Sequence, residues 1–182
     1  MITILLFHPD PTASRANRAL AGAAALLPGT EVVDMTALYP DGRVDHEAES
    51  RRLLAAERLV IQFPVHWYST PPSYQAWADA VLTRMFYVLP PEGARLAGLP
   101  VMVTATAGSD AQAYRPGDRN FAPLAELLAP LRATAHRCGW AWAEPFLLYG
   151  MNHLTDAQVA AEADRYARRL VGWAAGPLQR AA

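Results

Sequence analysis

The chain has 182 residues, of which 52% are hydrophobic and 18% charged, and its formal net charge is -1 at pH 7. This length suits a single domain, residues 1–182, that buries one substantial core. The near-neutral charge gives no reason to propose nucleic acid or a membrane surface as a partner. One cysteine, Cys138, excludes an intramolecular disulfide framework and a cysteine zinc cluster, and the histidines show no metal-ligand spacing. With no leader pattern and no membrane-length apolar run, a cytoplasmic protein is expected.

Apolar runs alternate with helical periodicity along the chain. Residues 2–7 form a continuous apolar run, typical of a parallel strand covered on both faces. A helix is predicted over residues 14–27, where Pro28-Gly29 stops it. Further strands are predicted at 31–35, 59–63 and 100–105, and further helices at 46–57, 73–84, 120–138 (interrupted near Pro123 and Pro130) and 155–173.

The last strand is expected within residues 140–148, where Pro145 limits it to an edge or an early end. Strict alternation of strand and helix predicts an α/β fold, a doubly wound parallel sheet. Five strands with helices on both faces fit the flavodoxin-like order.

The first candidate cluster follows the first strand and contains His8, Ser14 and Asn17 in the stretch HPDPTASRAN, which includes Pro11. Backbone N–H groups and the helix dipole favour a phosphate at such a helix start. The alternative is that Ser14 only caps the helix and His8 is an exposed loop residue. The chain has neither the GxGxxG dinucleotide fingerprint nor a P-loop lysine, so a nucleotide triphosphatase is disfavoured.

The second cluster is the aromatic loop after the strand at 59–63, where His66, Trp67 and Tyr68 stand between prolines. In open α/β sheets, ligands lie outside the carboxyl ends of the strands. A stiff loop of rings at that position predicts a wall for a planar cofactor. Buried aromatic residues are more often core, so Trp67 is also compatible with a packing role.

The third cluster lies just past the strand at 100–105 and contains Thr104, Thr106 and Gly108, with Tyr114 downstream. Hydroxyls and backbone N–H groups there suit the edge of a ligand, while the alternative is an ordinary turn between strand and helix. All three loops are expected to converge on one edge of the sheet.

These residues resemble the flavodoxin-like NAD(P)H:quinone oxidoreductases, through HPDPTASRAN, VIQFPVHWYSTPPSYQAWADAVL and TATAG with the later tyrosine. The resemblance covers residues 2–173 and is greatest to the short bacterial type, which includes ancillary subunits of glutathione-regulated potassium efflux systems. It implies a tightly bound FMN and a homodimer with active sites at the subunit interface. It also implies two-electron, ping-pong reduction of quinones by NADH or NADPH. No residue pattern for binding the 2′-phosphate of NADPH is found, so the sequence does not distinguish NADH from NADPH.

The resemblance also implies roles for individual residues, with Tyr114 and His66 as the candidate catalytic groups. By this resemblance, the FMN phosphate and ribityl chain would be held by His8, Ser14, Arg15, Ala16 and Asn17. The isoalloxazine would be lined by Pro64, Val65, His66, Trp67 and Tyr68. Its pyrimidine end would face Thr104, Thr106, Ala107, Gly108 and Tyr114. Donors from Thr106–Gly108 and Tyr114 would stabilise the negative charge that grows there when the flavin takes a hydride. His66 either donates to flavin or substrate or is an exposed loop histidine.

The chain departs from the family pattern at several positions. Ala105-Thr106-Ala107-Gly108 stands where Thr-Thr-Gly-Gly is common. Val65-His66 stands where the family usually has a leucine or similar residue together with a glutamine or tyrosine. The residues directly after Tyr114 are Arg-Pro-Gly-Asp-Arg-Asn, with no histidine at the place where some members carry one that aids a charge relay.

Two other classes of function remain open. One is a regulatory flavin-binding subunit that docks on a potassium efflux transporter and is thereby peripheral to the inner membrane. The other is a flavodoxin-type electron carrier, against which the His8-Pro9 loop and the net charge of -1 argue.

Overall fold

Six parallel strands form one sheet in the computed structural model, which describes residues 1–10 and 12–177. The order is β2-β1-β3-β4-β5, and β6 also pairs with β4, so the predicted flavodoxin-like arrangement is confirmed with one additional segment. The strands are β1 (Ile2–Leu6), β2 (Thr30–Asp34), β3 (Arg58–Pro64), β4 (Pro100–Thr106), β5 (Ala141–Trp142) and β6 (Phe146–Leu148).

β5 and β6 are two halves of one interrupted edge strand. Val101 of β4 pairs with Trp142, and Thr104 pairs with Phe146 further along the same strand. Pro145 lies between the two halves and has no N–H to donate to β4. The expected edge position is therefore confirmed, while the strand resumes as β6 after Pro145 instead of ending there.

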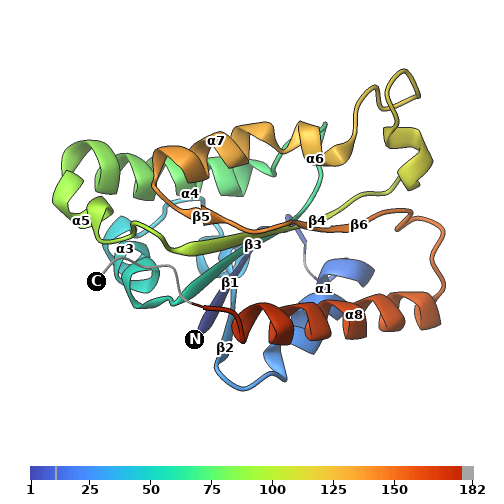
Figure 1. Ribbon diagram of the computed structural model, residues 1–182, viewed down its shortest axis with the longest axis horizontal. Helices are drawn as coiled ribbons and strands as arrows, with labels where there is room; N and C mark the ends of the chain where they lie inside the picture. The colour runs from blue at the N-terminus through green and yellow to red at the C-terminus, as the bar shows by residue number, and fades with distance from the viewer. Residues whose placement is uncertain (11, 178–182) are drawn as a thin grey trace.

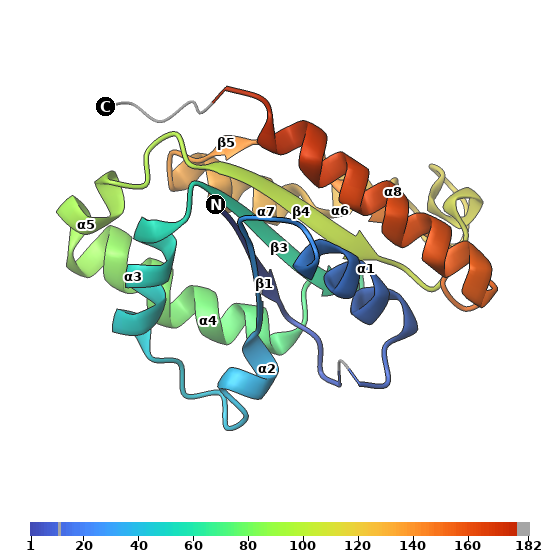
Figure 2. The same ribbon diagram turned by 90° about the horizontal axis from the view of Figure 1, so that it is seen from below.

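Helices cover both faces of the sheet (Figure 1). On one face lie α1 (Arg15–Ala25) and α8 (Asp156–Ala174), which run side by side in Figure 2. On the other lie α3 (His46–Ala55), α4 (Pro72–Thr83), α6 (Leu124–Leu127) and α7 (Ala129–Arg137). Shorter elements are α2 (Met35–Leu38), α5 (Pro90–Ala94), the π-helix η1 (Arg84–Val88) and the 3₁₀-helix η2 (Ala111–Tyr114). Within the described residues, no helix combines the length and apolar character needed to cross a membrane.

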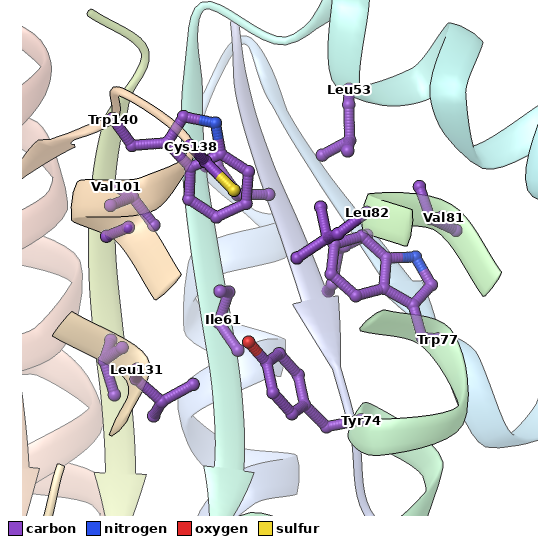
Figure 3. Packing of buried hydrophobic residues seen from close by; sticks show 14 of the residues in the cluster. Leu53, Ile61, Tyr74, Trp77, Val81, Leu82, Val101, Leu131, Cys138 and Trp140 are labelled. Carbon is purple, nitrogen blue, oxygen red and sulfur yellow. The ribbon is translucent and has the colours of Figure 1, made fainter. Parts of the chain in front are cut away.

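The sheet separates two cores because side chains alternate along each strand. On the α4 side, Trp77 and Tyr74 pack toward Ile61 of β3, as Figure 3 shows. On the α1 and α8 side, Val60 packs among aliphatic residues and Tyr166. The same alternation places Gln62, the residue after Ile61, on the α1 and α8 side.

The predicted helix at 120–138 is wrong at its start. Asn120 lies in a loop, Phe121 has a φ of 67°, and α6 begins only at Leu124. The helix restarts as α7, with Pro130 in its first turn, where the missing N–H costs no intrahelical bond. The two prolines thus divide the segment at the expected places.

Candidate ligand-binding site

A cavity of about 450 Å³ opens at the carboxyl ends of β1, β3, β4 and β6. Its volume falls within the range of small-molecule sites, and the edge is the one at which open α/β sheets bind ligands. The lining residues come from four separate loops and are His8, Ala13, Ser14, Arg15, Ala16, Asn17, Pro64, Val65, His66, Thr106, Ala107, Gly108, Met151 and Asn152.

The first wall is the N-terminus of α1. Ser14 is the N-cap, and its Oγ accepts the N–H of Asn17 at 3.1 Å. The N–H groups of Arg15 and Ala16 belong to the first turn, which has no intrahelical acceptor for them. Both residues line the cavity, so this end of the helix offers donors and a positive dipole to an anion.

The guanidinium of Arg15 is held beside the start of α8. It donates to Asp156 at 2.6 Å and to the carbonyl of Leu154 at 2.9 Å. The side chain thereby ties the first wall of the cavity to the chain segment that follows β6.

His8 is a half-buried, uncharged donor at the same end of the cavity. Burial, aided by the nearby His66, lowers the pKa of its imidazole below the usual value. Its Nδ1 accepts the N–H of Asp10 at 3.0 Å, so the neutral ring carries its proton on Nε2. His8 can therefore donate one hydrogen bond to a ligand without bringing a charge.

The second wall is made by the aligned ends of β3 and β4. Pro64 pairs with Thr106, and the N–H of Val65 donates to the Thr106 carbonyl at 2.8 Å. Gly108 follows and lies against Asn152, because a Cβ added there would come within 2.8 Å of the Asn152 side-chain nitrogen. Glycine at this position lets the two loops approach closely.

The aromatic loop is a strained two-residue hairpin turn. His66 and Ser69 exchange both backbone hydrogen bonds at 2.9 Å, and Trp67 and Tyr68 between them have φ values of 46° and 66°. Such a turn normally carries Asn-Gly, because a left-handed backbone is costly for larger side chains. Strain of this kind gathers at functional sites. The rings are 93% and 43% exposed, so the interpretation of Trp67 as a core residue is wrong.

Four of the predicted site residues do not line the cavity. Thr104 is buried inside β4, where its hydroxyl donates to Tyr166 at 3.3 Å. Tyr114 is buried against Tyr149, with ring centroids 5.5 Å apart, and burial raises the pKa of its hydroxyl. Trp67 and Tyr68 stand in the exposed turn, beside the cavity residue His66.

The remaining predicted residues are brought together, as their placement after β1, β3 and β4 implied. They are His8, Ser14, Arg15, Ala16, Asn17, Pro64, Val65, His66, Thr106, Ala107 and Gly108. Pro11 of the first loop lies outside the described residues.

Sequence reasoning missed three lining residues: Ala13, just before the predicted Ser14, and the pair Met151 and Asn152 after β6. Met151 donates its N–H to the Ala107 carbonyl at 3.2 Å, which brings the loop after β6 onto the loop after β4. The available signal for Met151 and Asn152 was their position directly after the last predicted strand, at the same edge of the sheet.

A family model described as a flavodoxin-like fold matches residues 1–170. The uncharacterized NAD(P)H oxidoreductase YdeQ of Bacillus subtilis is 34% identical over 92% of this chain and 84% of its own length. The glutathione-regulated potassium-efflux system ancillary protein KefF of Klebsiella pneumoniae is 35% identical over 95% of this chain and 96% of its own. The solved structure of general stress protein 14 from Treponema denticola in complex with FMN superposes with a TM-score of 0.82, at 28% identity, over 94% of this chain and 96% of that one.

The strained turn can be tested by giving it the residues that its backbone prefers. We expect the double substitution Trp67→Asn/Tyr68→Gly to raise the free energy of unfolding by about 1 kcal/mol, because the left-handed conformation then costs less. Urea denaturation of the ligand-free protein measures this change. The same residue types introduced in α1, as Arg18→Asn within the helix and Leu26→Gly at its C-cap, serve as a control that should lose stability. A loss of stability in the turn variant would show that the turn is unstrained.

Proposed function

This chain belongs to the family with the flavodoxin-like fold, and we propose that it is an FMN-dependent NAD(P)H:quinone oxidoreductase. The observation that carries the proposal is the cavity itself. The first-turn N–H groups of α1, the end of β3 at Pro64 and the close approach of Gly108 to Asn152 meet there. The similarity to an NAD(P)H oxidoreductase and to a protein solved with FMN supports the same reading.

The residues present fit the phosphate end of FMN. Ser14 to Asn17 supply a helix start whose first-turn N–H groups line the cavity, and His8 adds a donor on Nε2. A dianionic phosphate there would meet the helix dipole and neutral donors, with Arg15 engaged by Asp156.

They also fit a flat ring. Pro64 to His66 form one side of the cavity, and the Thr106 hydroxyl and the Gly108 N–H lie along another. The Ala107 N–H between them is donated to the Leu148 carbonyl at 2.8 Å. When bound, FMN would supply the two-electron hydride chemistry of a ping-pong reduction of quinones by NADH or NADPH. The protein holds the ring and places donors where charge develops. The exposed rings of Trp67 and Tyr68 offer a flat apolar surface to a nicotinamide or quinone, with His66 as a neighbouring donor.

A homodimer is part of the proposal, with each site completed at the interface. Exposed aromatic side chains gather beside the cavity: Trp67, Tyr68 and Phe121, the last 79% exposed. The Tyr68 hydroxyl lies 3.4 Å from Asn120, which places the turn next to the Phe121 loop. An apolar rim at the mouth of a polar cavity suits a second copy of the chain.

The similarity to an ancillary protein of a potassium-efflux system favours a second candidate function. In this alternative the flavin-loaded chain docks on a potassium efflux transporter and regulates it. The same cavity serves both functions, so the alternative differs only in the partner.

The cofactor assignment is tested with the purified protein. We expect it to bind FMN and to bind riboflavin at least about tenfold more weakly, because riboflavin lacks the phosphate that the α1 start would hold. Without air, NADH or NADPH should bleach the flavin band and a quinone should restore it, which also ranks the two nicotinamides. A protein that takes up neither flavin would remove the proposed function.

The proposed dimer interface is tested by placing a charged side chain in it. We expect Trp67→Arg to shift the protein from dimer to monomer in sedimentation velocity, since it buries a cation in an apolar contact. Leu26→Arg is the matched control, because Leu26 is 85% exposed, close to the 93% of Trp67, but lies at the far end of α1. A wild-type protein that sediments as a monomer at high concentration would refute the dimer.

The transporter alternative is tested in membranes of the source cells. If the chain docks on a transporter, an affinity-tagged copy should recover a potassium transport protein after mild cross-linking, and its deletion should change potassium efflux. Recovery without any membrane protein, together with unchanged efflux, would leave the free enzyme as the function.

A further inference from the structure

A set of fully buried polar side chains lies directly behind the cavity wall. Gln62 of β3, Thr104 of β4 and Tyr166 of α8 are completely buried, among the apolar residues between the sheet and α1 and α8. None of the three lines the cavity. Burying polar groups costs free energy unless each is hydrogen-bonded, so such a cluster calls for an explanation.

The cluster is a continuous chain of hydrogen bonds that ends at the cavity. Thr104 Oγ1 donates to the Tyr166 hydroxyl at 3.3 Å, and that hydroxyl donates to Gln62 Oε1 at 3.3 Å. Gln62 Nε2 donates to the Asn17 carbonyl at 3.0 Å and to Asn17 Oδ1 at 3.3 Å. Asn17 Nδ2 then donates to Thr106 Oγ1 at 2.9 Å. Asn17 and Thr106 both line the cavity.

One atom fixes the donor-to-acceptor direction of every hydrogen bond in this series. The backbone carbonyl of Asn17 can only accept, so the Gln62 atom facing it must be the NH₂ group. That group also faces the Asn17 side chain, whose near atom must therefore be Oδ1. Asn17 then presents its NH₂ to Thr106, and Gln62 presents its oxygen to Tyr166. Burial raises the pKa of Tyr166, which keeps its hydroxyl a donor at any physiological pH.

This direction of the hydrogen bonds determines what the Thr106 hydroxyl can do. Its oxygen accepts from Asn17, and no acceptor within the described parts of the chain takes its hydrogen. We propose that Gln62 and Tyr166 are positioning residues that hold the Thr106 hydroxyl as a hydrogen-bond donor to an acceptor atom of the ligand in the cavity. Because all of these hydrogen bonds point the same way, they polarise one another and strengthen the last donor, the Thr106 hydroxyl.

This inference rests on the proposed function for the identity of the ligand. In FMN the acceptors near the β4 loop would be the pyrimidine oxygens and nitrogen, which gain negative charge on reduction. A fixed donor there binds the reduced flavin more tightly than the oxidised one and raises the reduction potential.

The first test needs no cofactor. In FMN-free protein labelled with ¹⁵N, we expect Gln62→Met to shift the Asn17 side-chain amide signal and to speed its hydrogen exchange at least about tenfold, because the amide loses the partner that orients it. Thr3→Val is the matched control: Thr3 is equally buried in the sheet, but its hydroxyl has no hydrogen-bond partner among residues 1–10 and 12–177. An Asn17 signal that is unchanged in Gln62→Met would overturn the oriented chain.

The second test uses a double-mutant cycle on FMN binding. We expect Thr106→Val and Gln62→Met each to weaken binding about tenfold, the cost of one hydrogen bond to a polar ligand. The double variant should also be weakened about tenfold rather than about hundredfold, because both changes remove the same donor. Each should move the flavin midpoint potential to a more negative value, with a smaller effect for Tyr166→Phe. Thr3→Val should leave both unchanged.

The outcomes separate the two proposals. Independent, multiplicative losses in the cycle, or an unchanged potential, would overturn the role of the chain toward the ligand. A wild-type protein that binds no FMN overturns the proposed function and FMN as the acceptor, while the amide comparison still decides whether the chain is oriented.

Discussion

The Val65 N–H donates to the Thr106 carbonyl at 2.8 Å, which continues the ladder between β3 and β4 one step past the paired Pro64 and Thr106. The site depends on this register, because it ends both strands at one level and turns both following loops outward together. A shift by one residue would turn Gln62 from the α1 side to the α4 core and remove Thr106 from the cavity wall. The backbone pairing of two buried strands therefore places the polar groups.

The apolar core on the α1 and α8 side tolerates a polar chain because every step in it has a partner. Asn17 connects the N-terminus of α1 to β3 and β4, and Tyr166 connects α8 to the same strands. The cavity wall is thus anchored in the interior rather than held by loops alone, which favours a preorganised site. The strained turn at Trp67 and Tyr68 is the opposite case, since it lies outside the core and is held by the two bonds between His66 and Ser69.

Much of the fold followed from local pattern. Continuous apolar runs predicted the central strands because both of their faces are buried. Pro145 predicted an edge position or an early end for the last strand, and Pro130 predicted the restart at α7. The start of the helix after residue 120 could not be predicted, because it depends on Phe121 adopting a left-handed backbone. The loops after β1, β3 and β4 were located from the general rule for strand ends. Met151 and Asn152 were missed although they follow the last predicted strand, because a contact between distant loops, the Met151 N–H with the Ala107 carbonyl, brings them to the cavity.

The sequence by itself determined the strand and helix alternation, the edge of the sheet that carries the cavity and most of the lining residues, because these depend on burial patterns and on which residues follow each strand. Only the tertiary structure decided which of those side chains face the cavity. It turned Thr104 inward to Tyr166, left Trp67 in solvent and joined Gln62 to Asn17. These contacts link residues far apart in the chain, and their direction follows from one carbonyl oxygen that can only accept.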